Sequence, residues 1–326
     1  MSMGLQDRGV AGAARALAWA AGAARGARLS TLIFHRVLRE PDPIFPLELD
    51  ARRFERLMRI VAAAFDVLPL HAATARLASG DLPPRALTIS FDDGYADNHD
   101  VALPILQRLG LPATIFIATS FLDGGRMWND TVIECVRRTR LERLDLAEFG
   151  LPVLPCGSAA ERRRVIDQLL PVVKYRPPAD REPLLQRLWV LCGQPALPQD
   201  LMMRSDQVRA LPKAGIDVGA HTVHHPILRT LPDDEARAEM RGSRERLQQI
   251  LDAPVALFAY PNGRPGTDYD DRHAAMARSL GFAAAVSTRP GVAKAGDDLF
   301  QLPRFTPWEP NPRRWAISLA LSHVRG

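Results

Sequence analysis

Short apolar runs alternate with amphipathic stretches along most of this chain. Runs of strand length occupy residues 31–34, 65–68, 87–91, 113–117, 216–220, 255–260 and 282–287. Helical periodicity follows or separates them at residues 51–64, 102–109, 233–251 and 270–280. Strands that alternate with helices form βαβ units, whose strands are parallel. We therefore predict an α/β fold, and about seven such strands favour a (β/α) barrel over an open sheet.

The alternation is interrupted between residues 130 and 203. This region contains proline-punctuated helical patterns and no convincing strand. We interpret it as a helical insertion after the fourth strand, not as an independent domain. The remaining organisation is a helical extension over residues 1–29, a barrel over residues 30–306 and a helical tail over residues 307–326.

Charge and cysteine content argue against a nucleic-acid-binding protein and against a cysteine-rich scaffold. The net charge is +5, but no clustered basic motif accompanies it, so we expect no nucleic-acid partner. Cys135, Cys156 and Cys192 are few, odd in number and far apart. They match neither a zinc-binding spacing nor a disulfide framework, and they favour a reducing compartment.

The first 29 residues are rich in alanine and glycine, and Arg15 and Arg25 interrupt their apolar character. They contain no compact apolar core of a secretion signal and no run long enough to span a bilayer. We predict an amphipathic helix that packs on the barrel, with peripheral contact to a membrane surface as the alternative. The chain is accordingly expected in the cytoplasm, where a lipid-linked or nucleotide-linked precursor is a more natural substrate than an exported polymer.

Polar side chains follow four of the predicted strands directly. They are His35, the pair Asp92 and Asp93, the pair His221 and His225, and Asn262. The carboxyl ends of parallel strands share one rim of a barrel, and barrel enzymes place their active sites there. We therefore expect these side chains to form one site.

The histidine pair and the acid pair together predict a metal site. His221 and His225 are spaced i, i+4, so that one helical turn would point both imidazoles in the same direction. Helical zinc sites of this spacing carry a glutamate where this chain has Thr222, so the base must come from elsewhere. Two imidazoles and one carboxylate leave a coordination position open for water, and the second carboxylate is then free. Zn²⁺ suits these donors best, and Co²⁺, Ni²⁺ and Fe²⁺ are alternatives.

The motifs resemble those of a known family. "SFDDGYADN" and "HTVHH" resemble the first two signature motifs of the NodB-type polysaccharide deacetylases, carbohydrate esterase family four, and "FAYPNG" resembles the third. The likeness covers roughly residues 30–306, including "LIFHRV" and "QLPRF". It implies a deformed (β/α) barrel that hydrolyses N-acetyl groups on sugars with a divalent metal.

The resemblance also implies roles for individual residues. Asp93, His221 and His225 would bind the metal, and Asp92 would be the general base that takes a proton from the attacking water. The backbone N–H of Tyr95 would complete the oxyanion site.

The chain departs from the family pattern in two places. Many relatives carry an arginine in the third motif that steadies the base, whereas this chain has Ala259 there; Arg304 is the candidate replacement. The histidine that protonates the leaving amine in many relatives has no match, because His323 lies in the predicted helical tail. His35 is the better-placed candidate for that role.

Candidate substrate contacts come from two regions. Tyr260, Pro261 and Asn262 belong to the third motif, although Asn262 also fits a tight turn with the glycine that follows. Trp128, Asn129 and Asp130 open the insertion and are candidates for a lid that binds substrate over the site. Trp128 either stacks on a sugar ring or anchors the insertion to the barrel. We expect surface or packing roles for His71, His99 and His273, and we expect His224 to point away from the metal or toward groups behind its ligands.

The predicted function is a metal-dependent hydrolase that removes N-acetyl groups from a sugar, a polysaccharide or its precursor. One alternative is a hydrolase of the same fold that cleaves another non-peptide C–N bond. The other is a non-catalytic relative that binds glycans. The sequence does not predict an oligomeric state.

Overall fold

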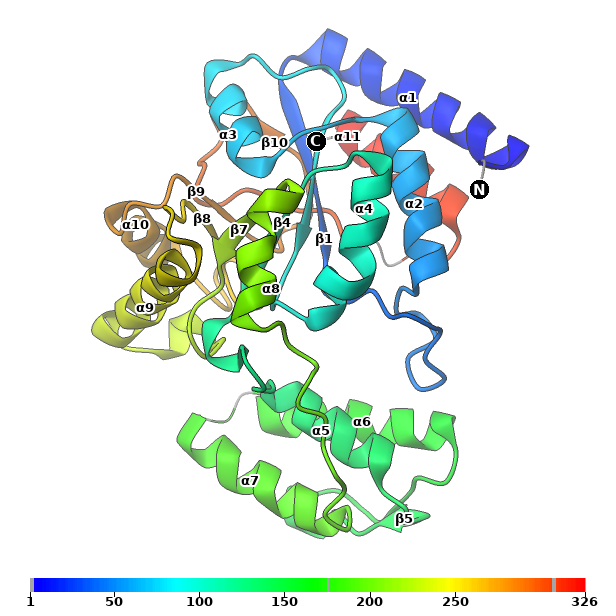
Figure 1. Cartoon of the computed structure of the whole chain (residues 1–326), viewed down its shortest axis with the longest axis vertical. Coiled ribbons are helices and arrows are strands. Elements are labelled where there is room, and N and C mark those ends of the chain that lie inside the picture. Colours follow the sequence, from blue (N-terminus) through cyan, green and yellow to red (C-terminus); the bar gives the residue numbers. More distant parts are fainter. Residues whose placement is uncertain (1–2, 175, 177, 307–308, 326) are drawn as a thin grey trace.

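A curved, mostly parallel sheet forms the centre of the structure, a computed structural model that describes residues 3–174, 176, 178–306 and 309–325 (Figure 1). Its strands run in the order β10-β1-β3-β4-β7-β8-β9, and β2 pairs with β3. They are β1 (Arg28–Phe34), β2 (Asp66–Val67), β3 (Ala86–Phe91), β4 (Ala113–Ile117), β7 (Ile216–Ala220), β8 (Leu257–Ala259), β9 (Ala284–Val286) and β10 (Ala293–Lys294). Among these strands only β10 pairs in an antiparallel manner. The predicted barrel-type fold of about seven parallel strands is confirmed.

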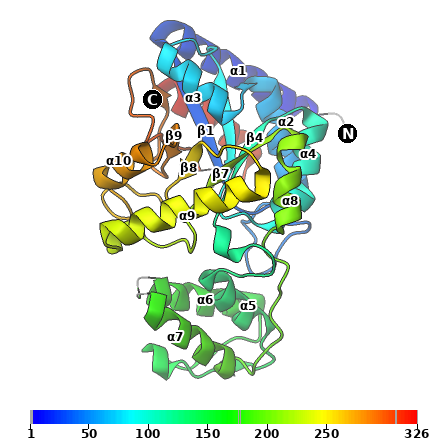
Figure 2. The same ribbon diagram turned by 60° about the vertical axis from the view of Figure 1, so that its left-hand side comes forward.

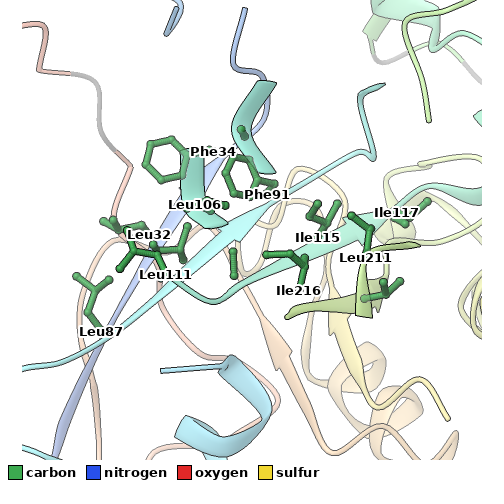
Figure 3. Close-up of a cluster of buried hydrophobic side chains, with 14 of the residues drawn as sticks. Leu32, Phe34, Leu87, Phe91, Leu106, Leu111, Ile115, Ile117, Leu211 and Ile216 are labelled. Carbon is green, nitrogen blue, oxygen red and sulfur yellow. The ribbon is translucent and has the colours of Figure 1, made fainter. Parts of the chain in front are cut away.

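The strands are apolar on both faces because helices cover the outside of the sheet and side chains fill its interior. β1 and β3 pair in register from Ser30 with Leu87 to Phe34 with Phe91. Every residue of β1, β3 and β4 is buried. Figure 3 shows part of this core, in which the rings of Phe34 and Phe91 lie 5.4 Å apart. Burial of each such side chain contributes about 1.5–3 kcal/mol to folding.

Two isolated bridges close the gap between the last parallel strand and the first. Leu302 pairs with Val286 of β9, and Phe305 pairs with Leu32 of β1. Both bridges are parallel. Arg304 lies between them in the chain, and its side chain is fully buried. The closing segment therefore carries a charged group into the interior of the barrel.

Helices surround the sheet in both views (Figures 1 and 2). They are α2 (Ala51–Ala64), α3 (Leu70–Ser79), α4 (Leu103–Leu109), α8 (Ser205–Ala210), α9 (Asp233–Leu251) and α10 (Asp271–Ser279). A π-helical turn at Asn98–Ala102 and 3₁₀ turns at Thr119–Phe121, Pro212–Ala214 and Leu228–Thr230 connect some of them.

The sequence of α2 explains both its start and its orientation. The Oδ1 atom of Asp50 accepts a hydrogen bond from the N–H of Arg53 at 3.0 Å, which caps the first turn. Phe54, Met58 and Val61 then recur at helical spacing and are fully buried. The predicted helix at these positions is confirmed.

The N-terminal helix α1 (Leu5–Arg25) lies beside the C-terminal helix α11 (Pro312–Arg325) and against α2 (Figure 1). Ala11, Ala14 and Ala18 form its buried face, so the predicted packing helix is confirmed. Residues 307 and 308, where we predicted the tail to begin, lie outside the described residues. None of the described helices combines the length and apolar character needed to cross a membrane.

The insertion after β4 forms a separate layer below the barrel in Figure 1, and it also stands apart from the barrel in Figure 2. Its helices are α5 (Trp128–Arg138), α6 (Ala159–Lys174) and α7 (Pro178–Leu191), with a 3₁₀ turn at Ala147–Phe149. They share a hydrophobic cluster of their own, to which Ile44 from the loop before α2 contributes. The prediction that this region contains no strand was wrong. β5 (Arg143–Leu144) and β6 (Leu154–Pro155) form a short antiparallel ribbon.

Candidate active site

The two adjacent acids lie in a tight turn at the carboxyl end of β3. Asp93 has φ 76° and Gly94 has φ 87°, so both residues are left-handed. Such a conformation is unfavourable for a residue with a side chain, and it is concentrated at functional sites. A Cβ at Gly94 would lie 3.1 Å from Cγ2 of Ile117, which further favours glycine. The turn separates the two carboxylates into different surroundings.

His221 and His225 follow β7, but they do not lie on a helical turn as we predicted. The segment between them is a loop in which Thr222 has φ 65° and His225 has φ 54°. The N–H of His225 donates to Oγ1 of Thr222 at 3.1 Å. The two imidazole rings are nevertheless adjacent, with centroids 4.8 Å apart. The convergence that we predicted is therefore present, but left-handed residues produce it.

Asp93, His221 and His225 form a group that could hold a metal ion. Oδ1 of Asp93 lies 3.5 Å from Nε2 of His221 and 3.4 Å from Nε2 of His225. Two ligand atoms about 2 Å from a tetrahedral ion lie roughly 3.3 Å apart, so these separations fit a shared cation. This Oδ1 atom is buried and has no hydrogen-bond partner among the described residues. A cation would satisfy it.

A backbone carbonyl fixes the orientation of the first imidazole. Nδ1 of His221 donates to the carbonyl oxygen of Ala259 at 2.8 Å. In the neutral ring, Nε2 therefore carries the lone pair that faces Asp93. The resemblance led us to expect an arginine where this chain has Ala259. No side-chain pattern predicts the role of Ala259, because only its main chain takes part.

Burial and neighbouring charges shift the pKa values of these three groups. Burial lowers the pKa of His225 to about 4, so this imidazole is neutral at neutral pH. Burial would also lower the pKa of His221, but Asp93 and Asp92 raise it above its usual value. Burial would raise the pKa of Asp93, whereas the facing imidazoles hold it below its usual range. Asp93 is therefore an ionised donor.

The second acid, Asp92, is held by Arg304. Nη1 of Arg304 donates to Oδ1 of Asp92 and Nη2 donates to Oδ2, each at 2.7 Å. Nε of Arg304 donates to the carbonyl of Ser287 at 2.8 Å, which fixes the plane of the guanidinium. Burial would raise the pKa of Asp92, but Arg304 and His221 lower it below its usual value. Arg304 thus occupies the place that we proposed for it.

A glutamate that the sequence analysis did not single out holds the histidine loop. Oε2 of Glu239, on α9, accepts the backbone N–H groups of Val223 and His224, each at 2.9 Å. Oε1 accepts Nδ1 of the exposed His224 at 2.7 Å. Glu239 therefore positions the loop that carries His225. Its place in a generally charged helix gave no signal of this role.

A cavity of about 390 Å³ lies beside Asp93, between the barrel rim and the insertion. Its wall includes His35 and Arg36 after β1, Tyr95, the loop before α2, and Asn129 and Asp130 on α5. His35 is exposed. The cavity therefore brings the end of β1, the acid turn and the insertion to one place.

The backbone N–H of Tyr95 is not directed at Met202, the residue with which Tyr95 pairs. Tyr95 forms an antiparallel bridge with Met202, but the flanking residues make its hydrogen bonds. Ala96 donates to Leu201 at 2.8 Å, and Met203 donates to Gly94 at 3.0 Å. In such a pair the central N–H points away from the partner strand.

The third-motif residues are placed differently from the prediction of substrate contact. Tyr260 is fully buried, stacks on Tyr269 at 3.8 Å and donates its hydroxyl to the carbonyl of Phe300. Pro261 is buried as well, and neither residue lies in the wall of the 390 Å³ cavity that contains Asp93. Asn262 is partly exposed and left-handed, with φ 58°, in keeping with a turn.

Trp128 packs against the hydrophobic cluster of the insertion. The guanidinium of Arg181 lies 5.0 Å from the centroid of its ring. Its side chain is not part of the wall of the 390 Å³ cavity. Of the two roles that we weighed, anchoring the insertion agrees better with this position.

The remaining histidines have structural surroundings. His323 is buried and contacts Oγ of Ser30 and the carbonyl of Pro84 at 2.8 and 3.0 Å. His273 is buried in the first turn of α10. His71 is exposed and His99 is partly exposed, and each faces a carboxylate. None of these four lies in the wall of the 390 Å³ cavity.

Parallel strands closed around a buried Asp–Arg pair, with an Asp–His–His group at their carboxyl ends, define a hydrolase of the deformed-barrel type. The chain belongs to the polysaccharide deacetylase family, whose model matches residues 79–143 and 180–285, just over half of its length. The unmatched stretch between these segments lies in the insertion. A similar protein is the polysaccharide deacetylase homologue YxkH of Bacillus subtilis (strain 168). It is 19% identical to this chain over 280 residues, which cover 85% of this chain and 71% of YxkH.

Solved structures of similar proteins share the fold. The Streptococcus pyogenes deacetylase PplD, in complex with acetate, has a TM-score of 0.61 and 19% identity, covering 90% of this chain and 99% of PplD. IcaB from Ammonifex degensii has a TM-score of 0.57 and 19% identity, covering 89% and 97%. The deacetylase domain of BpsB from Bordetella bronchiseptica has a TM-score of 0.53 and 16% identity, covering 86% and 95%.

Proposed function

We propose that this enzyme removes N-acetyl groups from a polysaccharide or its precursor, with a divalent cation held by Asp93, His221 and His225. The observation that carries the proposal is the buried Oδ1 of Asp93, which has no hydrogen-bond partner among the described residues and faces two imidazole nitrogens at 3.4 and 3.5 Å. Family membership supports the reaction, and acetate, its expected product, is the ligand of the similar protein PplD.

The donor set favours Zn²⁺, and Co²⁺, Ni²⁺ or Fe²⁺ would accept the same ligands. When bound, such a cation supplies Lewis acidity, which polarises the acetamide carbonyl and makes water more acidic. Ala259 fixes the orientation of the His221 imidazole, and Glu239 holds the loop that carries His225.

Asp92 acts as the general base in this proposal. Arg304 keeps its carboxylate ionised inside the protein, and the fork of two hydrogen bonds leaves other lone pairs on both oxygens. Asp92 takes one proton from the water that adds to the acetamide carbon. The C–N bond then breaks, and acetate and an amine are released.

The leaving nitrogen needs a proton, and we assign its delivery to His35, which lies in the cavity wall with Asp93. The N–H of Tyr95 donates to the carbonyl oxygen as negative charge develops there. One such donor contributes about 3 kcal/mol to transition-state stabilisation in other enzymes. Exchange with solvent returns Asp92 and His35 to their starting protonation states.

The test is acetate release from a panel of N-acetylated glycans, with and without a chelator. Asp92→Asn should abolish turnover while cation binding survives, and Asp93→Ala should lose both. Asp167→Asn, on the exposed face of the insertion, is the control and should change neither. Full acetate release by the Asp92 or Asp93 variant would overturn the proposal. Ammonia release without acetate would indicate hydrolysis of another C–N bond.

A further inference from the structure

The first turn of α5 presents a buried carboxyl group to the cavity beside Asp93. Asp130 is only 3% exposed and lies in the cavity wall. Its Oδ1 atom accepts the hydroxyl of Tyr95 at 3.2 Å. Its Oδ2 atom is buried and has no hydrogen-bond partner within the described parts of the chain. A buried acceptor of this kind destabilises a fold unless water or a ligand supplies a donor.

The neighbouring residue repeats the pattern. Oδ1 of Asn129 is also buried without a partner among the described residues, and Asn129 lines the same cavity. Its Nδ2 atom donates to the hydroxyl of Tyr95 at 3.5 Å. Two adjacent acceptor oxygens are therefore left for groups that enter the cavity.

The arginines of the cavity wall do not satisfy these acceptors. Nε of Arg36 pairs with Asp97 at 2.8 Å. Arg137 pairs with Asp42 and with Glu134. Burial raises the pKa of Asp130 to about 7; Arg36 opposes this rise, and Asp93 adds to it. No donor among the described residues reaches Oδ2 of Asp130 or Oδ1 of Asn129, so a ligand in the cavity can supply one.

We propose that Asn129 and Asp130 bind ring hydroxyl groups of the sugar whose acetamide is placed at Asp93. Hydroxyls are compact donors, and an N-acetylated pyranose carries several close to its acetamide. The insertion would thereby select glycans over other N-acetyl compounds. This inference rests on the proposed function, because that function places the acetamide at Asp93.

The first experiment measures binding without turnover. In an Asp92→Asn background, calorimetry would give the affinity for N-acetylglucosamine tetrasaccharides with β-1,4 or β-1,6 linkage. Asp130→Asn keeps an acceptor for Tyr95 but removes the charged oxygen, so we expect affinity for the bound tetrasaccharide to fall about tenfold or more. Asn129→Ala should weaken it by about threefold or more. Asp167→Asn is the matched control and should have no effect.

The second experiment separates substrate contact from structural damage. It compares the N-acetylated tetrasaccharide with 4-nitrophenyl acetate, an acetyl donor without hydroxyl groups, in enzyme with Asp92 intact. The Asp130 and Asn129 variants should raise KM for the glycan and leave kcat/KM for the ester unchanged. An equal loss on both substrates, or no loss on either, would overturn the inference.

Two other results have distinct meanings. Tighter binding of the fully deacetylated tetrasaccharide than of the acetylated one would also overturn the inference, because the pair would then recognise a cation. If the unaltered enzyme releases no acetate from any glycan, the proposed function fails. Unchanged glycan affinity in both variants instead counts against the role of Asn129 and Asp130 alone.

Discussion

Arg304 and Asp92 form an ion pair in which both side chains are almost completely buried. The pair is joined by two hydrogen bonds of 2.7 Å, and Arg304 makes further bonds to Ser287 and Ser90. Two charges removed from water are tolerated because each satisfies the other. Loss of one partner leaves the other charge uncompensated in the core.

We expect Arg304→Met to lower the free energy of unfolding by about 3–5 kcal/mol at neutral pH. It should also abolish acetate release, because the pKa of Asp92 would rise. Urea unfolding and an acetate assay measure the two effects. Adding Asp92→Asn to Arg304→Met should recover part of the lost stability, because no unpaired charge remains. An Arg304→Met protein as stable as the parent would contradict this account of the pair.

Asp130 is expected to make stability depend on pH. Its pKa is about 7 in the folded protein, against 3.8 for an ordinary aspartate. Between these values the folded state binds more protons than the unfolded state, so stability falls as pH rises, by at most about 1.4 kcal/mol per pH unit. Asp130→Asn removes this dependence. Its free energy of unfolding should therefore rise relative to that of the parent protein as the pH increases to about 7.

Urea unfolding at a series of pH values, in the presence of a chelator, measures this difference. Asp167→Asn is the control, and its curve should run parallel to that of the parent. Curves for the parent and Asp130→Asn that keep a constant separation from about pH 4 to 7 would show that Asp130 has an ordinary pKa.

The sequence predicted the residues of the site better than their conformations. Asp92, Asp93, His221 and His225 were recognisable because two acids after an apolar strand and a spaced histidine pair are unusual patterns. The left-handed conformation of His225 was not predictable, because i, i+4 spacing equally fits a helical turn. Ala259 was also missed, since a backbone carbonyl leaves no trace in the sequence.

At the scale of elements, α9 supports the site through Glu239. Its carboxylate accepts two backbone N–H groups of the loop that carries His225. Burial would raise the pKa of Glu239, but His224 and these N–H groups lower it, so the carboxylate is ionised. A neutral amide at this position could not accept all of these hydrogen bonds equally well.

We therefore expect Glu239→Gln to weaken binding of Zn²⁺ by about tenfold or more, because partners that orient metal ligands typically contribute this much. Competition with a chromophoric chelator measures the affinity. Glu235→Gln, an exposed position on the same helix, is the matched control. Equal zinc affinity of the two variants would mean that the loop keeps its shape without Glu239.

The sequence predicted the long strands but not the ribbon in the insertion or the bridges that close the barrel. The long parallel strands were predicted because each is a continuous apolar run between turn residues. The ribbon of β5 and β6 was not, because two residues per strand are too short to show periodicity. The closure of the barrel was likewise hidden, because Leu302 and Phe305 form single bridges and no run of strand length.

For the molecule as a whole, cation binding should stabilise the fold. The three proposed ligands come from the ends of β3 and β7, so a bound ion joins segments that are far apart in the sequence. An ion that binds only the folded state adds about 2.7 kcal/mol at a hundredfold excess over its Kd. A chelator should therefore lower the melting temperature of the parent protein. Asp93→Ala should make the melting temperature insensitive to chelator, and an equal decrease in both proteins would argue against a cation at this site.

Closure of the barrel by Leu302 and Phe305 determines when the active site becomes complete during protein synthesis. Asp92 and Arg304 are separated by 212 positions in the chain. During synthesis, the acid turn leaves the ribosome long before its counter-ion, and the base lacks its guanidinium until the ring is complete. Nascent chains should therefore remain inert until residues 302–305 have emerged and docked, and catalytic competence would report that this docking is complete.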